Sequence, residues 1–180
     1  FVNPFAEIPT VDILCSFYNR DGEPFESSPE YILRKAHKVF QETTGLQMET
    51  MGELEYYIIA EDEEAYSVPD QKGYHESRPF NKFTDYRVEA MQLIAQAGGM
   101  IKYGHSEVGN FTLDGKIYEQ NEIEFLPTNI EDAADQLVIA KWIMRQLAYE
   151  YGVTLTFAPK ITVGKAGSGM HVHCKFTKDG

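Results

Sequence analysis

Two glutamates stand two residues apart in Gly52-Glu53-Leu54-Glu55, inside an apolar and aromatic run from Met51 to Ala60 that predicts a β-strand. Alternate residues of a strand point to the same face, so Glu53 and Glu55 would lie side by side. Neighbouring carboxylates repel each other unless a positive charge compensates them, and a divalent ion supplies such a charge. A solvated strand face is the competing interpretation, because exposed alternation is common in antiparallel sheets.

Two further glutamates lie near the ends of other expected strands. Glu107 belongs to His105-Ser106-Glu107-Val108, and Glu122 belongs to Gln120-Asn121-Glu122-Ile123-Glu124. If these strands pair, oxygen ligands from three strands would surround Mg²⁺ or Mn²⁺, which favour carboxylate and water over thiolate. Glu124 shares a face with Glu122 and is an alternative ligand.

The segment Gly167-Ser168-Gly169-Met170-His171-Val172-His173 adds two imidazoles on one strand face, directly after small residues. Glycines there would let a ligand approach the backbone closely, and His171 could bind a metal. Equally, one histidine could be structural and the glycines could only form a bulge. Upstream, Lys160 could meet phosphate oxygens or be an ordinary surface lysine.

Composition excludes several other classes of function. The formal net charge of -12 opposes binding to nucleic acid or to an anionic membrane surface. The sequence contains no P-loop, no GxGxxG and no GxSxG. Cys15 and Cys174 are isolated, and neither a signal peptide nor a membrane-spanning run is present, so we expect a cytoplasmic protein.

The elements that must position these residues follow from apolar periodicity and turn residues. Ser28 and Pro29 begin a helix that Gly45 ends, and Thr84 or Asp85 caps another that stops at Gly98-Gly99. The acidic and aromatic stretch Glu61–Asn81 is either a functional loop or a disordered insertion. The whole predicts an α+β fold with helices on one side of a largely antiparallel sheet. Expected helices are 29–44, the one between Thr84 or Asp85 and Gly98-Gly99, and 130–151. Expected strands are 11–18, 51–60, 100–108, 116–125, 153–158 and a last one after Gly169.

In this order, Gly52-Glu-Leu-Glu-Tyr-Tyr, His105-Ser-Glu-Val, Gln120-Asn-Glu and Pro159-Lys-(x3)-Gly-Lys-Ala-Gly-Ser-Gly-Met-His-Val-His resemble the glutamine synthetase catalytic domain. The resemblance implies a curved, largely antiparallel sheet with helices on its outer face. It also implies that residues 1–20 end an N-terminal β-grasp-like domain or form a linker strand. Residues 21–180 would then be the N-terminal half of the catalytic domain, truncated at its C-terminus.

The same resemblance implies an ATP-dependent ligase of glutamine biosynthesis, which condenses glutamate with ammonia through a γ-glutamyl phosphate in a ring-shaped homo-oligomer. Two or three Mg²⁺ or Mn²⁺ ions would serve each site, with ATP as co-substrate. Carried over by motif, one metal would bind Glu55, Glu107 and Glu122, and a second would bind Glu53 and His171. Substrate would meet Gly167 and Ala166, and His173 would lie beside the ATP phosphates.

The chain departs from the family pattern at Ala166, where the family has Asn, and at Ser106, where it usually has His. A γ-glutamyl ligase for another amine, or a non-catalytic structural or regulatory relative, therefore stays open. A cupin-like site built on His171 and His173 would need acids downstream, whereas here they lie upstream. The family's flap glutamate, its arginines and its final metal glutamate would follow Gly180, so we expect residues 1–180 alone to be inactive.

Overall fold

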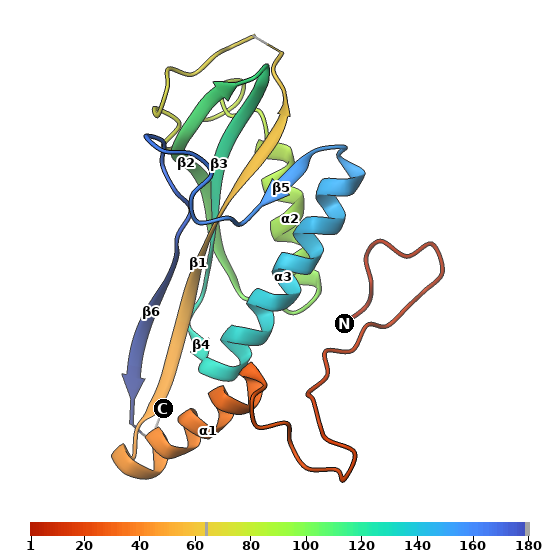
Figure 1. The fold of residues 1–180 in the computed structure, drawn as a ribbon, viewed down its shortest axis with the longest axis vertical. Coiled ribbons are helices and arrows are strands. Elements are labelled where there is room, and N and C mark those ends of the chain that lie inside the picture. Colours follow the sequence, from red (N-terminus) through yellow and green to blue (C-terminus); the bar gives the residue numbers. More distant parts are fainter. Residues whose placement is uncertain (64, 179–180) are drawn as a thin grey trace.

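The computed structural model describes residues 1–63 and 65–178 of the chain. Its elements follow one another as three helices interspersed with six strands (Figure 1). Their bounds are α1 Pro29–Thr44, β1 Gln47–Glu61, α2 Thr84–Gln96, β2 Ile101–Leu113, β3 Lys116–Phe125, β4 Thr128–Asn129, α3 Ile130–Glu150, β5 Thr154–Thr156 and β6 Met170–Thr177.

The long strand β1 is the centre of one sheet in which every pairing is antiparallel. On one side β1 pairs with β4 and β3, and β3 in turn pairs with β2; on the other side β1 pairs with β6 and β5. Strands far apart in the sequence therefore meet along β1. This arrangement confirms the predicted α+β class with a largely antiparallel sheet.

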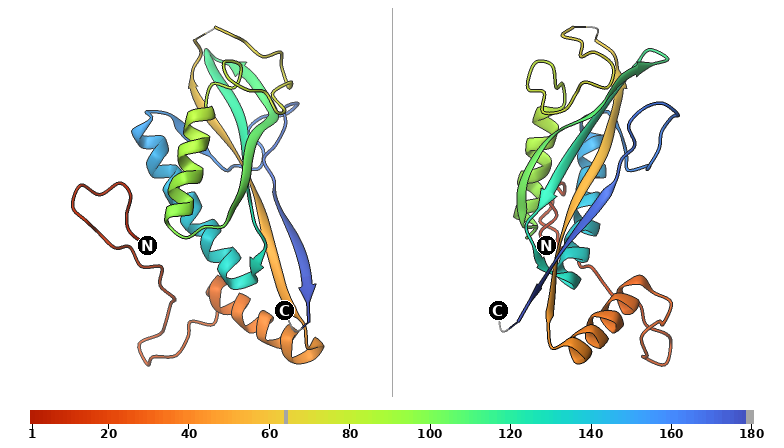
Figure 2. Two further views of the ribbon diagram at one scale, coloured as in Figure 1. Left: turned by 180° about the vertical axis from the view of Figure 1, so that it is seen from behind. Right: turned by 90° about the vertical axis from the view of Figure 1, so that its left-hand side faces the viewer.

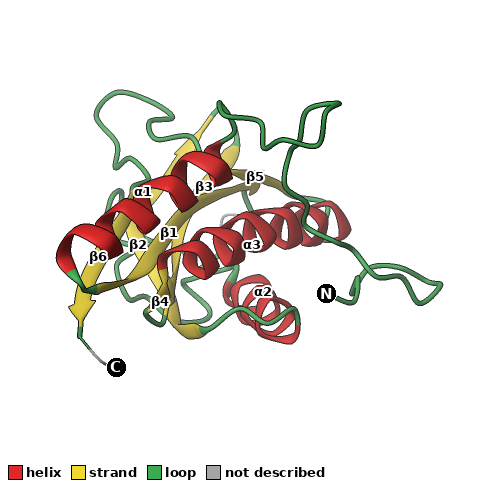
Figure 3. Ribbon diagram, turned by 90° about the horizontal axis from the view of Figure 1, so that it is seen from below, coloured by secondary structure: helices red, strands yellow, loops and turns green. Residues whose placement is uncertain are grey.

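Helices α2 and α3 lie beside each other against one face of the sheet, and α1 lies at the end where β1 begins (Figures 2 and 3). At the two-residue period of a strand, Leu54, Tyr56 and Ile58 of β1 face the helices and belong to the core. Apolar side chains between sheet and helices form the core. They include Leu54, Tyr56, Ile58, Ala90, Ile94, Ile123, Phe125, Ala140, Ile143, Met144 and Leu147.

The ends of the helices test the capping predictions. Helix α1 has the predicted bounds, and Gly45 ends it with the positive φ of 68° that glycine tolerates. The residue at the N-cap of α2 is Phe83, so the prediction of Thr84 or Asp85 was wrong. The Thr84 hydroxyl instead donates to Asn81 Oδ1 at 2.6 Å, in the turn before the helix.

The predicted strand at residues 11–18 does not form. Only the isolated bridges Val2–Val11 and Tyr18–Pro24 occur there, because no neighbouring strand offers this segment a ladder. Its Ile13 side chain is 77% exposed. The division of the chain at residues 20 and 21 stays a prediction.

Strand β2 runs five residues beyond the predicted Val108, and β5 is shorter than predicted. In the stretch between β1 and α2, the backbone N–H groups of Gln71, Gly73 and His75 donate to carbonyls on the free edge of β2, so this part is an ordered loop. The last three residues, Lys178-Asp179-Gly180, are turn-like in sequence, and Asp179 and Gly180 lie outside the described residues. No helix within residues 1–63 and 65–178 is both long and apolar enough to cross a membrane.

Candidate metal centre

The sheet face that α2 and α3 leave uncovered gathers most of the predicted ligands. Antiparallel register places Glu55 opposite Glu122 and Glu53 opposite Glu124. Because directly opposed residues share a face, four carboxylates from two strands lie next to one another. The alternation that buries Leu54 against the helices thus directs Glu53 and Glu55 to the opposite side.

One half of this face centres on His105, which β2 places opposite Glu122. The His105 Nε2 atom lies 3.5 Å from Glu122 Oε1 and 3.8 Å from Glu124 Oε1, and all three residues are buried. Their potential ligand atoms lie within 4.8 Å of one another. Glu107 lies on the other side of the imidazole, with Oε1 3.6 Å from His105 Nδ1.

The other half is formed where β6 pairs with β1 and places His171 opposite Glu53. His171 Nδ1 lies 3.2 Å from Glu53 Oε2 and 3.7 Å from Glu55 Oε1. His173 Nε2 lies 2.8 Å from Glu53 Oε1. Both imidazoles are largely exposed, whereas the carboxylates beneath them are not, so this half opens toward solvent.

The electrostatics of this face favour a cation. Burial raises the pKa of Glu55, and the nearby carboxylates of Glu122 and Glu107 raise it further. The pKa of His105 is raised to about 8, first by its hydrogen bond to Glu122. The part of this shift that comes from the neighbouring carboxylates is a repulsion that a divalent ion would relieve.

One acid of the face already has a cation. Lys102 Nζ lies 2.7 Å from Glu124 Oε2. Although burial raises the pKa of Glu124, the hydrogen bonds from Lys102 and Tyr103 outweigh it, and the pKa is lowered overall. The remaining donors, carboxylate oxygens and imidazole nitrogens, are ligand types suited to Mg²⁺ or Mn²⁺. The residues therefore fit such an ion, with Glu53, Glu55, Glu107, Glu122 and His171 as candidate ligands.

Beside the carboxylates, the loop before β6 is held by side chains of the sheet. Gln120 Nε2 donates to Glu55 Oε2 at 2.8 Å and to Gly167 O at 2.9 Å. The Tyr57 hydroxyl donates to Ala166 O at 2.8 Å. The two predicted substrate-contacting residues, Ala166 and Gly167, thus lie next to a predicted metal ligand.

Not every predicted residue is placed as its suggested role required. Lys160 Nζ donates to Lys165 O within its own loop, which argues against a free phosphate-binding ammonium. His173 is paired with Glu53, and its nucleotide role stays a prediction. The interpretation of the sequence missed Gln120 and His105 as members of the site, although each stands two residues before a named glutamate and shares its strand face.

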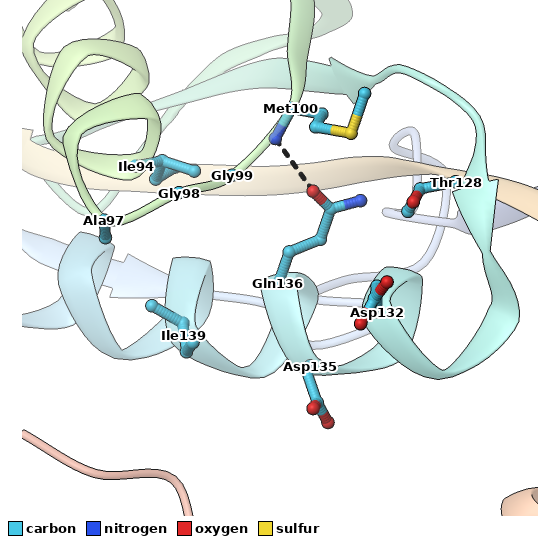
Figure 4. Close-up of a pocket in the computed structure, with 10 residues that line it drawn as sticks. All are labelled: Ile94, Ala97, Gly98, Gly99, Met100, Thr128, Asp132, Asp135, Gln136 and Ile139. Atoms are coloured by element: carbon cyan, nitrogen blue, oxygen red, sulfur yellow. Dashed lines mark hydrogen bonds between the residues drawn. The ribbon is translucent and has the colours of Figure 1, made fainter. Parts of the chain in front are cut away.

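A separate cavity of about 250 Å³ lies between α3 and the end of α2. Figure 4 shows Gln136 pointing into it toward Met100, whose backbone N–H donates to Gln136 Oε1 at 2.8 Å, whereas Asp135 points away from Gln136. None of the predicted site residues lines this cavity. It therefore has no part in the carboxylate chemistry.

Comparison with known proteins agrees with the geometry. Residues 26–180 match the profile of the glutamine synthetase catalytic domain. Glutamine synthetases of Methanosarcina mazei and Thermus thermophilus are 32% and 28% identical to the chain over alignments of 171 residues that cover 93% of it. The chain spans 36% of the length of each of these two relatives.

Solved structures show the same fold. A cryo-electron microscopy structure of Plasmodium falciparum glutamine synthetase superposes with a TM-score of 0.79 at 19% identity, over 92% of this chain and 37% of that one. A structure of GmaS in complex with ADP superposes with a TM-score of 0.70 at 17% identity, over 88% of this chain and 36% of that one.

Proposed function

The chain belongs to the glutamine synthetase catalytic-domain family, and from this premise we propose that its natural protein is an ATP-dependent ligase joining glutamate to ammonia. Because the chain spans about a third of the relatives it matches, the reaction is proposed for the full-length protein. The proposed route passes through a γ-glutamyl phosphate. The ammonia nitrogen then displaces phosphate from the acyl carbon.

The observation that carries this proposal is the surplus of carboxylates on one sheet face beside a glycine-containing loop. We assign one ion to Glu55, Glu107 and Glu122, and a second to Glu53 and His171. When bound, Mg²⁺ or Mn²⁺ would neutralise charge on the transferring phosphoryl group.

The chain's own residues contribute positioning. Gln120 restrains the Glu55 carboxylate and the Gly167 carbonyl with one amide group, so a ligand of the metal and the proposed glutamate-binding loop keep a fixed separation. We propose that His173 donates a hydrogen bond to ATP phosphate. Its Nε2 now faces Glu53, which holds the imidazole over the acidic face.

Assembly into a ring-shaped homo-oligomer in the cytoplasm is proposed from family membership. The exposed apolar side chains of the N-terminal segment support burial against other parts of the natural protein, since Ile8 and Ile13 are each 77% exposed. No nucleic acid or membrane partner is proposed.

A γ-glutamyl ligase for a larger amine is the second candidate, and Ala166 favours it. Its side chain offers substrate no polar atom, and both of its backbone polar groups are bound by Gln71 and Tyr57. Substrate recognition at this position must therefore differ from that of a polar side chain. Product analysis with ammonia and with a series of alkylamines distinguishes the two candidates.

The test uses the full-length protein with ATP, Mg²⁺ and glutamate labelled with ¹⁸O in its side-chain carboxylate. If the carboxylate attacks the γ-phosphorus, one of its oxygens leaves with phosphate when the amine displaces it, so the released phosphate contains ¹⁸O. Phosphate release that needs neither glutamate nor amine, or that carries no label, would refute the proposal. A Glu122→Gln variant is the matched control and should release labelled phosphate at least about 100-fold more slowly.

A further inference from the structure

Ala166 has no polar side-chain atom, yet side chains from two distant parts of the chain hold it. Its N–H donates to Gln71 Oε1 at 2.6 Å, and its carbonyl accepts from the Tyr57 hydroxyl at 2.8 Å. Loop backbone groups at a surface are ordinarily satisfied by water or by near neighbours. Two long-range side-chain contacts on one half-buried residue therefore restrict where this part of the loop lies.

The residues on either side of Ala166 are held as well. Lys165 Nζ lies 2.5 Å from Asp70 Oδ2, and the Gly167 carbonyl accepts from Gln120. The Ser168 N–H donates to Pro159 O at 3.0 Å and closes the loop. Residues 165 and 166 are thus held by residues 70–71, and residues 166 and 167 are held by side chains of the sheet.

Gln71 is itself anchored to the sheet. Its backbone N–H donates to Asn110 O at 2.9 Å, and two further backbone N–H groups of the same loop, those of Gly73 and His75, donate to carbonyls of β2. A cap of this kind on a free strand edge fixes the backbone of residues 71–75. In Figure 1 this loop and the loop before β6 lie at the same end of the sheet. Gln71 therefore joins two loops separated by 95 residues of sequence.

We propose that Gln71, supported by the Asp70–Lys165 ion pair, is a positioning residue that holds the loop before β6 in its substrate-binding conformation. The predicted consequence for substrate rests on the proposed function, whereas the holding of the loop does not. Without Gln71 the loop populates other conformations, and substrate binds only to the competent fraction. The apparent affinity falls by that fraction, while turnover at saturation is unchanged.

The first experiment measures hydrogen exchange of the Ala166 amide in the full-length protein, without substrate. Gln71→Leu removes the acceptor and should speed exchange by roughly 3- to 10-fold, the effect of losing one hydrogen bond. Gln71→Glu keeps an acceptor oxygen and should stay near wild type. Gln146→Leu, on the exposed side of α3, makes the same chemical change far from the loop and is the control.

The second experiment measures steady-state kinetics of the same variants. Gln71→Leu should raise KM for the carboxylate substrate by roughly 3- to 10-fold with kcat within about twofold of wild type, and Gln71→Glu should restore KM. The double variant Asp70→Lys with Lys165→Asp exchanges the two charges and should reverse any increase in KM that Asp70→Lys causes alone.

The outcomes separate the two proposals. Unchanged exchange at Ala166 in Gln71→Leu overturns the positioning role, whatever the activity. A fall in kcat that Gln71→Glu shares with Gln71→Leu also overturns it, because the retained acceptor should then have rescued the loop. Faster exchange in a protein that shows no ligase activity would support the positioning role and contradict only the proposed function.

Discussion

Glu119 and Glu122 stand three residues apart on β3 and face opposite sides of the sheet, where their surroundings differ sharply. Both are nearly inaccessible, at 1% and 5% exposure. Glu119 lies on the helix-covered side and accepts four hydrogen bonds, from Asn81, Asn121 and the backbone N–H groups of Lys82 and Phe83. Glu122 lies on the open side between an imidazole and other carboxylates.

The difference distinguishes a structural carboxylate, Glu119, from a carboxylate suited to bind a metal ion, Glu122. Donors at 2.6–3.2 Å surround the Glu119 carboxylate, and the buried Arg87 lies in the same cluster through Asn81 and Asn121. Burial still raises the pKa of Glu119, although the Lys82 N–H opposes it. Burial alone therefore does not mark a candidate metal ligand, whereas a shortage of donors around a buried carboxylate does.

The largest expected effect comes from Glu122→Gln. Removal of one proposed ligand oxygen should lower the Mg²⁺-dependent activity of the full-length protein by at least about 100-fold, or about 2.7 kcal/mol. Glu122 also pairs with His105, which is neutral only well above its pKa of about 8. At such alkaline pH, loss of the repulsion between Glu122 and Glu55 should raise the free energy of unfolding without metal by about 0.2–1 kcal/mol. Activity assays and urea unfolding measure the two effects. A large fall in the free energy of unfolding beside the loss of activity would contradict the contrast between Glu119 and Glu122.

Glu119→Gln should do the reverse. An amide in place of the carboxylate presents N–H to donors that need an acceptor, so we expect the free energy of unfolding to fall by about 2 kcal/mol. The Mn²⁺ affinity of the folded Glu119→Gln variant, measured by calorimetry, should stay within about threefold of wild type. Removal of a true metal ligand would lower the affinity much further. A large loss of affinity with intact stability would show that the covered side takes part in metal binding.

Mn²⁺ itself should distinguish the two faces. At ten times its dissociation constant, a ligand that binds only the folded state stabilises it by about 1.4 kcal/mol. Wild type and Glu119→Gln should both show this gain in thermal unfolding, and Glu122→Gln should lose most of it. Equal stabilisation of all three proteins would place the ion elsewhere.

The smallest effect is expected at Lys102, which compensates Glu124 on the open side. Its side chain is 41% exposed, so Lys102→Gln should cost less than about 1 kcal/mol of stability. Loss of its positive charge should strengthen Mn²⁺ binding, which titration calorimetry measures. Weaker binding would show that Lys102 supports the ligand set rather than competing with the ion.

Much of the fold could be predicted from local patterns. The bounds of α1 and β3 were predicted to the residue, because Pro29 and Gly45 act within one turn and the β3 pattern is bounded by turn residues. The strand predicted at residues 11–18 was wrong, since an apolar alternation becomes a strand only where a partner completes its hydrogen bonds.

The candidate site likewise contains residues that local patterns indicate and residues that only long-range contacts reveal. Residue types and two-residue spacings indicated Glu53, Glu55, Glu122 and His171, because strand period is a local property. Neither period nor motif could indicate that Gln120 joins Glu55 to Gly167, or that Gln71 holds Ala166, since those contacts join segments far apart in the chain.

The sequence by itself determined the family, the alternation that directs acids to one face of each strand, and the ends of α1 and β3. Only the tertiary structure decided which acids face one another and which are saturated by donors. The physical reason is that the charge and hydrogen bonding of a carboxylate depend on groups brought near it by strand register and loop packing. Glu119 and Glu122 are the same residue type on one strand, and only their neighbours make one structural and the other a candidate ligand.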